Sequence, residues 1–260
     1  MNLKPIYWYL VLHTQNRLMT HVVERLSPKN ALDTATAVLD VFPADQLAMV
    51  LKLIGLYSLN RLDEALAFAN DAVLLYPHNI TLHGIRGNIL SQRGQNDAAL
   101  IAYDNVLTEQ PDHAAALLHR ASILADMGHT DLALACYEQV IQNDRNTADN
   151  VMSACIAKGS ILVQADRTTE LERFCNELLS KYDGSPAVLS MVGAFHCNID
   201  QPDEGLNYYK QALDLTKSNA AMAERLRAII SEIVEENTST ASVPTENATD
   251  CRNGGTAQID

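Results

Sequence analysis

Three prolines recur at a constant spacing of 34 residues: Pro43, Pro77 and Pro111. Each one closes a similar apolar stretch, and the three stretches end in AVLDVFP, AVLLYP and NVLTEQP. A fixed period of this length is typical of stacked helix–turn–helix units, each of which buries its apolar face only against its neighbours. The period therefore predicts an all-α solenoid of antiparallel helix pairs.

The pattern inside each unit agrees with this prediction. When each proline is numbered position 32, position 20 is where the two helices of a unit cross and should be small. It holds Ala31, Ala65, Ala99 and Ala133, and then departs to Leu171 and Gly205. Position 8 must allow the helices to approach closely, and Leu53 is its one large residue. The other units have small residues there: Gly87, Ala121, Gly159 and Gly193. Turn residues separate the helices: Asn60-Arg61, Gly94-Gln95, Gly128-His129, Asp166-Arg167 and Asp200-Gln201.

These residues resemble the tetratricopeptide repeat family, most clearly in GNILSQRGQNDAALIAYDNVLTEQP (Gly87–Pro111) and ASILADMGHTDLALACYEQVI (Ala121–Ile141). The resemblance covers roughly residues 27–216. It implies a right-handed superhelical solenoid that binds other molecules and does not catalyse. The frame fits least from Asn146 to Asp183, where a slip of four residues precedes units that start near Met152 and Pro186.

The two ends of the chain differ from the repeats. Residues 1–26 are expected to form an apolar-rich helix that packs on the solenoid, and residues 27–219 to hold the tetratricopeptide-like repeats. Residues 220–237 are amphipathic and predict a C-terminal capping helix. Its apolar face consists of Met222, Leu226, Ile229, Ile230 and Ile233. Residues 238–260 are rich in Ser, Thr, Asn and Gly, which predicts a disordered tail.

Composition excludes several function classes. A formal net charge of −13 argues against nucleic acid as a partner, because that binding depends on Lys and Arg contacts to phosphate. The apolar run Ile6–Leu12 is far shorter than the roughly 20 residues that span a bilayer, so no membrane insertion is expected. Five cysteines without a C-x-x-C pair predict free thiols in a reducing, cytoplasmic setting. They are Cys136, Cys155, Cys175, Cys197 and Cys251.

No motif for chemistry is present. The sequence has no phosphate-binding loop, no H-E-x-x-H and no G-x-S-x-G, so neither an enzyme nor a cofactor is expected. His83 and His119 project from neighbouring first helices. A metal site between them is the alternative to the favoured interpretation, in which both are ordinary helix residues and the chain holds no metal.

The first helix of each unit should line the concave side of the solenoid. At about 100° per residue, positions 5, 9 and 12 share a narrow face, with position 2 at its margin. The residues predicted to bind a peptide on this face are Leu47, Val50, Ile54, Tyr57, Gly84, Asn88, Ser91, Leu118, Ser122, Ala125, Ile156 and Ser160. All are uncharged. The basic residues with which some family members grip a peptide carboxylate are missing here.

Two alternatives remain open on these helices. The row Leu47, Val50, Ile54 and Tyr57 is either the floor for a ligand or a surface covered by residues 1–26, which carry Trp8 and other apolar side chains. Position 7 holds four cations, which either pack structurally or bind an acidic ligand: Lys52, Arg86, Arg120 and Lys158.

The function expected from these features is a non-catalytic adaptor or chaperone that holds a peptide segment of another protein in the concave groove. One alternative is a secretion-type chaperone that keeps an apolar secreted protein soluble. The other is a self-associating structural scaffold, which would make the chain a homo-oligomer.

Overall fold

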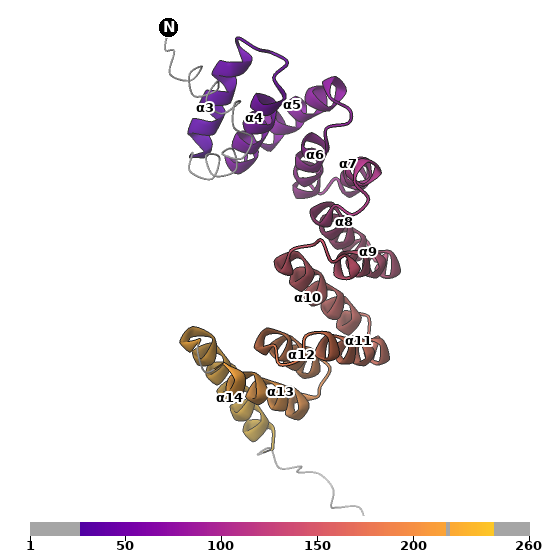
Figure 1. The fold of residues 1–260 in the computed structure, drawn as a ribbon, viewed down its shortest axis with the longest axis vertical. Coiled ribbons are helices and arrows are strands. Elements are labelled where there is room, and N and C mark those ends of the chain that lie inside the picture. The colour runs from indigo at the N-terminus through magenta and orange to yellow at the C-terminus, as the bar shows by residue number, and fades with distance from the viewer. Residues whose placement is uncertain (1–26, 217–218, 242–260) are drawn as a thin grey trace, which may run out of the picture. The chain divides into compact units, whose positions relative to one another are not determined.

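A computed structural model describes residues 27–216 and 219–241 of the chain. Within these two ranges the chain forms helices and no strands, so the all-α prediction is confirmed (Figure 1). The expected helix over residues 1–26 and residues 242–260 of the expected tail lie outside the described residues. The chain divides after Ile161 into two compact units, which are treated separately below.

The first unit is a series of helices joined by short turns. Its helices are α3 (Pro28–Leu39), α4 (Gln46–Ser58), α5 (Leu62–Leu75), α6 (Ile80–Gln92), α7 (Asn96–Glu109), α8 (Ala114–Asp126), α9 (Thr130–Gln142) and α10 (Ala148–Gln164), the last of which ends beyond the unit. Each helix contacts the next along the chain from α3 to α9. Within each helix–turn–helix repeat, α4, α6 and α8 are the first helices, and α5, α7 and α9 are the second helices.

Local sequence sets where the first helices begin and end. Asp45, Asn79 and His113 follow the repeat prolines by two residues and cap α4, α6 and α8. Each side chain accepts the backbone N–H three residues further on, at 2.8, 3.0 and 3.2 Å. Capping of this kind satisfies a backbone donor that the helix itself leaves unpaired. The turn after each first helix holds one residue with positive φ: Asn60, Gly94, Gly128, Asp166 and Asp200.

Small residues bring the two helices of a unit together. Ala65, Ala99 and Ala133, at position 20, are each 0% exposed. Opposite them, Gly87 on α6 lies directly against the ring of Tyr103 on α7, where an added Cβ would stand 2.7 Å from a ring carbon. Helices approach this closely only where a side chain is missing or minimal, so the periodic Gly and Ala positions determine the spacing of the pairs.

Leu53, the exception at position 8, changes the packing of α4. It is fully buried in the core cluster of the first unit. The closest approach of α4 is to α3 instead, through Gly55, where an added Cβ would lie 3.0 Å from the Cβ of Leu32. Accordingly, α4 packs more extensively on α3 than on α5.

The four-residue slip in the sequence frame corresponds to a longer helix. Helix α10 has 17 residues, whereas α4, α6 and α8 have 13 each. It begins at Ala148, four residues before Met152, where the frame starts its unit. About 3.6 residues make one turn. One extra turn at the N-terminal end of α10 therefore accounts for the poor fit there.

The second unit contains α11 (Thr168–Lys181), α12 (Pro186–Asn198), α13 (Pro202–Leu215) and α14 (Ala220–Ala241). Helices α12 and α13 cross where Gly193 faces Gly205. A Cβ added to Gly205 would lie only 2.7 Å from the carbonyl oxygen of Gly193, so neither position has room for a larger residue. Helix α14 contacts α13. The five residues of its apolar face, Met222 to Ile233, belong to or pack against the core cluster of this unit. The helix continues to Ala241, so the predicted start of a disordered tail at residue 238 is wrong.

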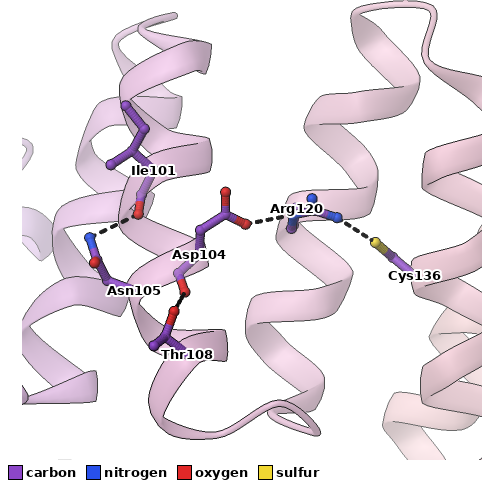
Figure 2. Close-up of polar contacts among 6 residues, drawn as sticks. All are labelled: Ile101, Asp104, Asn105, Thr108, Arg120 and Cys136. Atoms are coloured by element: carbon purple, nitrogen blue, oxygen red, sulfur yellow. Dashed lines mark hydrogen bonds and ion pairs between the residues drawn. The ribbon is translucent and has the colours of Figure 1, made fainter.

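The position 7 cations brace neighbouring helices of the first unit. Figure 2 shows Arg120 of α8 between Asp104 of α7 and Cys136 of α9. Its Nε donates to Asp104 Oδ1 at 2.8 Å, and one of its terminal nitrogens donates to Cys136 Sγ at 3.0 Å. Burial works to lower the pKa of Arg120, but the hydrogen bonds to Cys136 and Asp104 outweigh it and raise that pKa. One side chain thus joins three helices.

The other three cations also have partners within the first unit. Arg86 Nε donates to Asn70 Oδ1 of α5 at 2.8 Å, and Lys158 pairs with Glu138 of α9. The Lys52 ammonium lies 4.4 Å from the centroid of the Phe68 ring. These contacts support the interpretation of the position 7 row as structural packing.

A matched pair of glycines on α6 tests the helix spacing. Gly87→Ala should lower the free energy of unfolding by about 1–3 kcal/mol, because its Cβ overlaps Tyr103. Gly84→Ala should raise it by about 0.5–1 kcal/mol, because no atom lies within 4 Å of that Cβ and Ala favours a helix. Urea unfolding followed by circular dichroism measures both. Equal effects at the two positions would contradict the close crossing.

The bracing role of Arg120 is open to a similar test. Arg120→Met keeps the aliphatic stem but removes both hydrogen bonds, and should destabilise the chain by about 1 kcal/mol. Arg145→Met removes the same charge at an exposed position and should change stability by less than about 0.5 kcal/mol. Urea midpoints compare the two variants. A loss as large for Arg145→Met would mean that charge alone, and not the three-helix contact, stabilises the fold.

Candidate functional site

The residues that the sequence predicts for the site lie on the first helices, and none of them is buried. Ten are on α4, α6 and α8, and α6 contacts both of its neighbours. These ten therefore lie on one run of adjoining helices, here named the first-helix face: Leu47, Val50, Ile54, Tyr57, Gly84, Asn88, Ser91, Leu118, Ser122 and Ala125. The remaining two, Ile156 and Ser160, lie on α10, where Ile156 is exposed.

The α4 part of the first-helix face is apolar. Val50 and Tyr57 are half-buried and pack against the core cluster beneath α4. Leu47 and Ile54 are also half-buried and extend the same row. Apolar side chains that remain partly exposed to water gain free energy when a second apolar surface covers them. This end of the face is therefore suited to apolar contacts.

The α6 part is polar and built around one hydrogen bond. Tyr103 of α7 donates its hydroxyl hydrogen to Asn88 Oδ1 at 2.7 Å. Among the described residues, the amide nitrogen of Asn88 has no hydrogen-bond partner. Because the carbonyl oxygen is occupied, the orientation of the amide is set and its N–H groups remain able to donate.

His119 of α8 completes this cluster. Its ring stacks on Tyr103, with centroids 5.7 Å apart and planes 16° from parallel. His119 is exposed, and the partial desolvation of its ring lowers its pKa, which favours the neutral imidazole. Burial, with a further contribution from Tyr57, raises the pKa of Tyr103, so its hydroxyl stays protonated and can donate. The face around Asn88 therefore carries no charge at neutral pH.

Sequence reasoning did not include Tyr103 among the site residues because it lies on a second helix. The sequence signal for Tyr103 was the glycine at position 8 of the same repeat. Gly87 has no side chain, and so leaves space for the Tyr103 ring to extend past it to the first-helix face. His119 was noticed only as a possible metal ligand.

Other chemistry has little geometric support in the described ranges. His83 is buried and its Nε2 bonds to the carbonyl oxygen of Pro77 at 2.8 Å, whereas His119 stacks on Tyr103. No group of three metal-ligating side chains occurs in the part of the chain that the structure describes. Cys175 is a free thiol, and burial raises its pKa to about 12, so it is not an activated nucleophile. Within the same ranges, no helix has the length and apolar character needed to span a membrane.

Known proteins resemble this chain in sequence locally and in fold broadly. The family model "Tetratricopeptide repeat" matches residues 86–148. No sequence among curated proteins matches the chain significantly.

Among the solved structures that share the fold, three resemble this chain as follows. YrrB, described as a TPR protein with an unusual peptide-binding site, is 16% identical, covers 75% of this chain and 97% of its own, and has a TM-score of 0.51. PilF of Pseudomonas aeruginosa is 14% identical, with 76% and 87% covered and a TM-score of 0.53. A tetratricopeptide repeat protein from Parabacteroides merdae is 14% identical, with 87% and 98% covered and a TM-score of 0.52.

At these identities the structural likeness concerns the fold alone. The sequence match covers the α6–α9 region, where Gly87, Ala99, Ala121 and Ala133 follow the repeat frame. The helix pairs with small residues at their crossings extend this architecture to both sides of the matched segment. The family match identifies residues 86–148 as a tetratricopeptide repeat segment, and the chain shares the fold of the solved tetratricopeptide repeat structures.

Proposed function

We propose that this protein is a non-catalytic adaptor that binds a peptide segment of a partner protein on its first-helix face. A tetratricopeptide fold suggests protein–protein interaction, because stacked repeats create an extended surface for a partner. Fold alone does not determine function, so the proposal depends on the surface itself. The observation that carries it is the uncharged face on which the Tyr103–Asn88 hydrogen bond orients a free amide donor beside an apolar row.

Two kinds of contact would hold the peptide. Its apolar side chains would cover Val50, Ile54 and Leu118, which are half-exposed. Its backbone carbonyl groups would accept hydrogen bonds from the Asn88 amide. Gly84 leaves space for the backbone to approach α6, since no atom lies within 4 Å of where its Cβ would be. Apolar pockets for side chains combined with polar contacts to the main chain are the usual basis of peptide recognition.

Two further observations bear on the kind of partner. The solved structure of YrrB, which has this fold, is described as having an unusual peptide-binding site, so the fold is compatible with a peptide ligand. The position 7 cations, which were the alternative site for an acidic ligand, have structural partners on the second helices. An uncharged, partly apolar segment is therefore the ligand that the first-helix face accommodates best.

A charge placed in the apolar row tests the proposal. Peptides selected from a random displayed library against the wild-type protein provide the ligands. Ile54→Glu should weaken their binding at least about tenfold, because a carboxylate would have to be desolvated against an apolar peptide. The matched control is Ile101→Glu, which adds the same charge on α7 at a side chain that is 61% exposed and outside the face. Fluorescence anisotropy measures both affinities.

Two results would contradict the proposal. One is a set of selected peptides that bind Ile54→Glu as tightly as the wild type. The other is equal weakening by Ile101→Glu, which would assign the effect to net charge. Thermal melting by circular dichroism verifies that Ile54→Glu is folded at the temperature of the binding assay.

The orienting hydrogen bond can be removed separately. Tyr103→Phe keeps the ring against Gly87 and His119 but frees the Asn88 amide to rotate. It should weaken peptide binding by about three- to tenfold, the cost of one hydrogen bond of about 1 kcal/mol, with a stability change no larger than that. Asn88→Ala should weaken binding by a similar factor, and the double variant should be no weaker than either single one. Additive losses would show that Tyr103 does not act through Asn88.

A further inference from the structure

A second surface lies on the other side of α4 from the first-helix face. Helices α3, α4 and α5 enclose a groove of about 710 Å³, here named the acidic groove. Leu32, Leu56 and Phe68 contribute apolar side chains to its lining. Residues at positions 7 and 11 of α4 line it, whereas positions 5, 9 and 12 form the first-helix face. The two surfaces are therefore separate binding possibilities.

Carboxylates surround the apolar part of this groove. Asp33 lies on α3, Asp40 directly follows the end of α3, and Asp71 lies on α5. All three are exposed, and none of their carboxylates has an ion-pair or hydrogen-bond partner among the described residues. Glu64 also lines the groove, but it is paired with Arg61 at 2.6 Å. The unpaired carboxylates of the groove are therefore the three aspartates.

The groove exists because the bracing seen later in the unit is missing here. At the α7–α8–α9 step, Arg120 extends to Asp104 on one side and to Cys136 on the other, and so crosses the gap between the second helices. At the α3–α4–α5 step, the residue equivalent to Asp104 is Thr36, whose hydroxyl donates to the backbone oxygen of Leu32 at 2.8 Å. Lys52, the equivalent of Arg120, lies over the Phe68 ring instead. The gap remains open and its aspartates remain unpaired.

We propose that the acidic groove binds a basic amphipathic segment of a partner protein. Aliphatic stems of Lys or Arg would lie along Leu32, Leu56 and Phe68, and their cationic ends would reach Asp40 and Asp71. Long basic side chains combine apolar stems with charged ends in this way, and so match a groove with an apolar interior and an acidic rim. The net charge of −13 adds long-range attraction for such a partner.

Among the described residues, the cations in the lining are Lys52 and Arg61. The proposal therefore predicts that removing a cation and removing an aspartate change the affinity in opposite directions. Arg61 is neutralised by Glu64. Lys52 lines the groove over the Phe68 ring, where its positive charge repels an incoming basic segment. Its removal should therefore strengthen binding, whereas removal of an aspartate should weaken it. A merely structural role for the groove residues predicts no such pair of opposite effects.

The experiment uses the full chain and a short, fluorescently labelled amphipathic peptide made of Leu and Lys. Asp40→Asn combined with Asp71→Asn should weaken its binding about fivefold, as expected for the loss of two exposed charge pairs. Lys52→Gln should tighten it about twofold. The matched control combines Asp97→Asn with Asp214→Asn, which removes the same net charge at exposed positions outside the groove and should change binding less than twofold.

Several results would overturn the proposal. Equal weakening by the two double variants would mean that the peptide follows net charge and not the groove. Equal affinity for a peptide in which Glu replaces Lys would exclude charge recognition. Binding that occurs only after deletion of residues 1–26 would assign the groove to the chain's own N-terminal segment. The Asn substitutions keep side-chain size and lie at exposed positions, and circular dichroism verifies that the variants remain folded.

Discussion

The rest of the structure depends on close contact between paired helices at residues that have almost no side chain. Ala65, Ala99 and Ala133 are completely buried where the second helices cross the first, and Gly87 lies against the Tyr103 ring. A single helix pair has too little apolar surface to be stable alone, so each pair relies on its neighbours. The small residues permit that stacking because they bring the apolar faces within van der Waals distance. They also place Tyr103 where its hydroxyl reaches Asn88, the residue next to Gly87 on α6.

Departures from the repeat pattern produce the individual features of this chain. Leu53 replaces a small residue at position 8, and the closest approach of α4 shifts to α3 through Gly55. Thr36 stands where a later repeat has Asp104, so Lys52 cannot form the ion pair that Arg120 forms with Asp104, and it rests on Phe68. The repeats that follow the pattern are braced by Arg86 and Arg120, while the first step leaves an open acidic groove. The regular positions thus maintain the fold, and the irregular ones create surfaces that differ from repeat to repeat.

Much of the fold could be predicted because a repeat tests the same positions several times. The prolines at one period, the small residues at position 20 and the turn residues such as Asn60 and Gly94 all indicated one architecture. The region near Ala148 was harder to predict because an added helical turn changes only the spacing between repeats, and no residue type in the sequence indicates it. The end of α14 was placed too early, because composition changes at residue 238 while the helix continues to Ala241.

The sequence by itself determined the helical class, the repeat length and which residues of each first helix share a face. It could do so because, in a helix, the number of residues between two positions fixes the angle between their side chains. Only the tertiary structure decided how side chains from different helices meet. Tyr103 joins Asn88, Arg120 joins Asp104 and Cys136, and Lys52 lies on Phe68. These contacts join residues 15 or 16 positions apart on separate helices, and they depend on how closely and at what angle the helices cross. That geometry follows from packing the whole stack together, which no local pattern specifies.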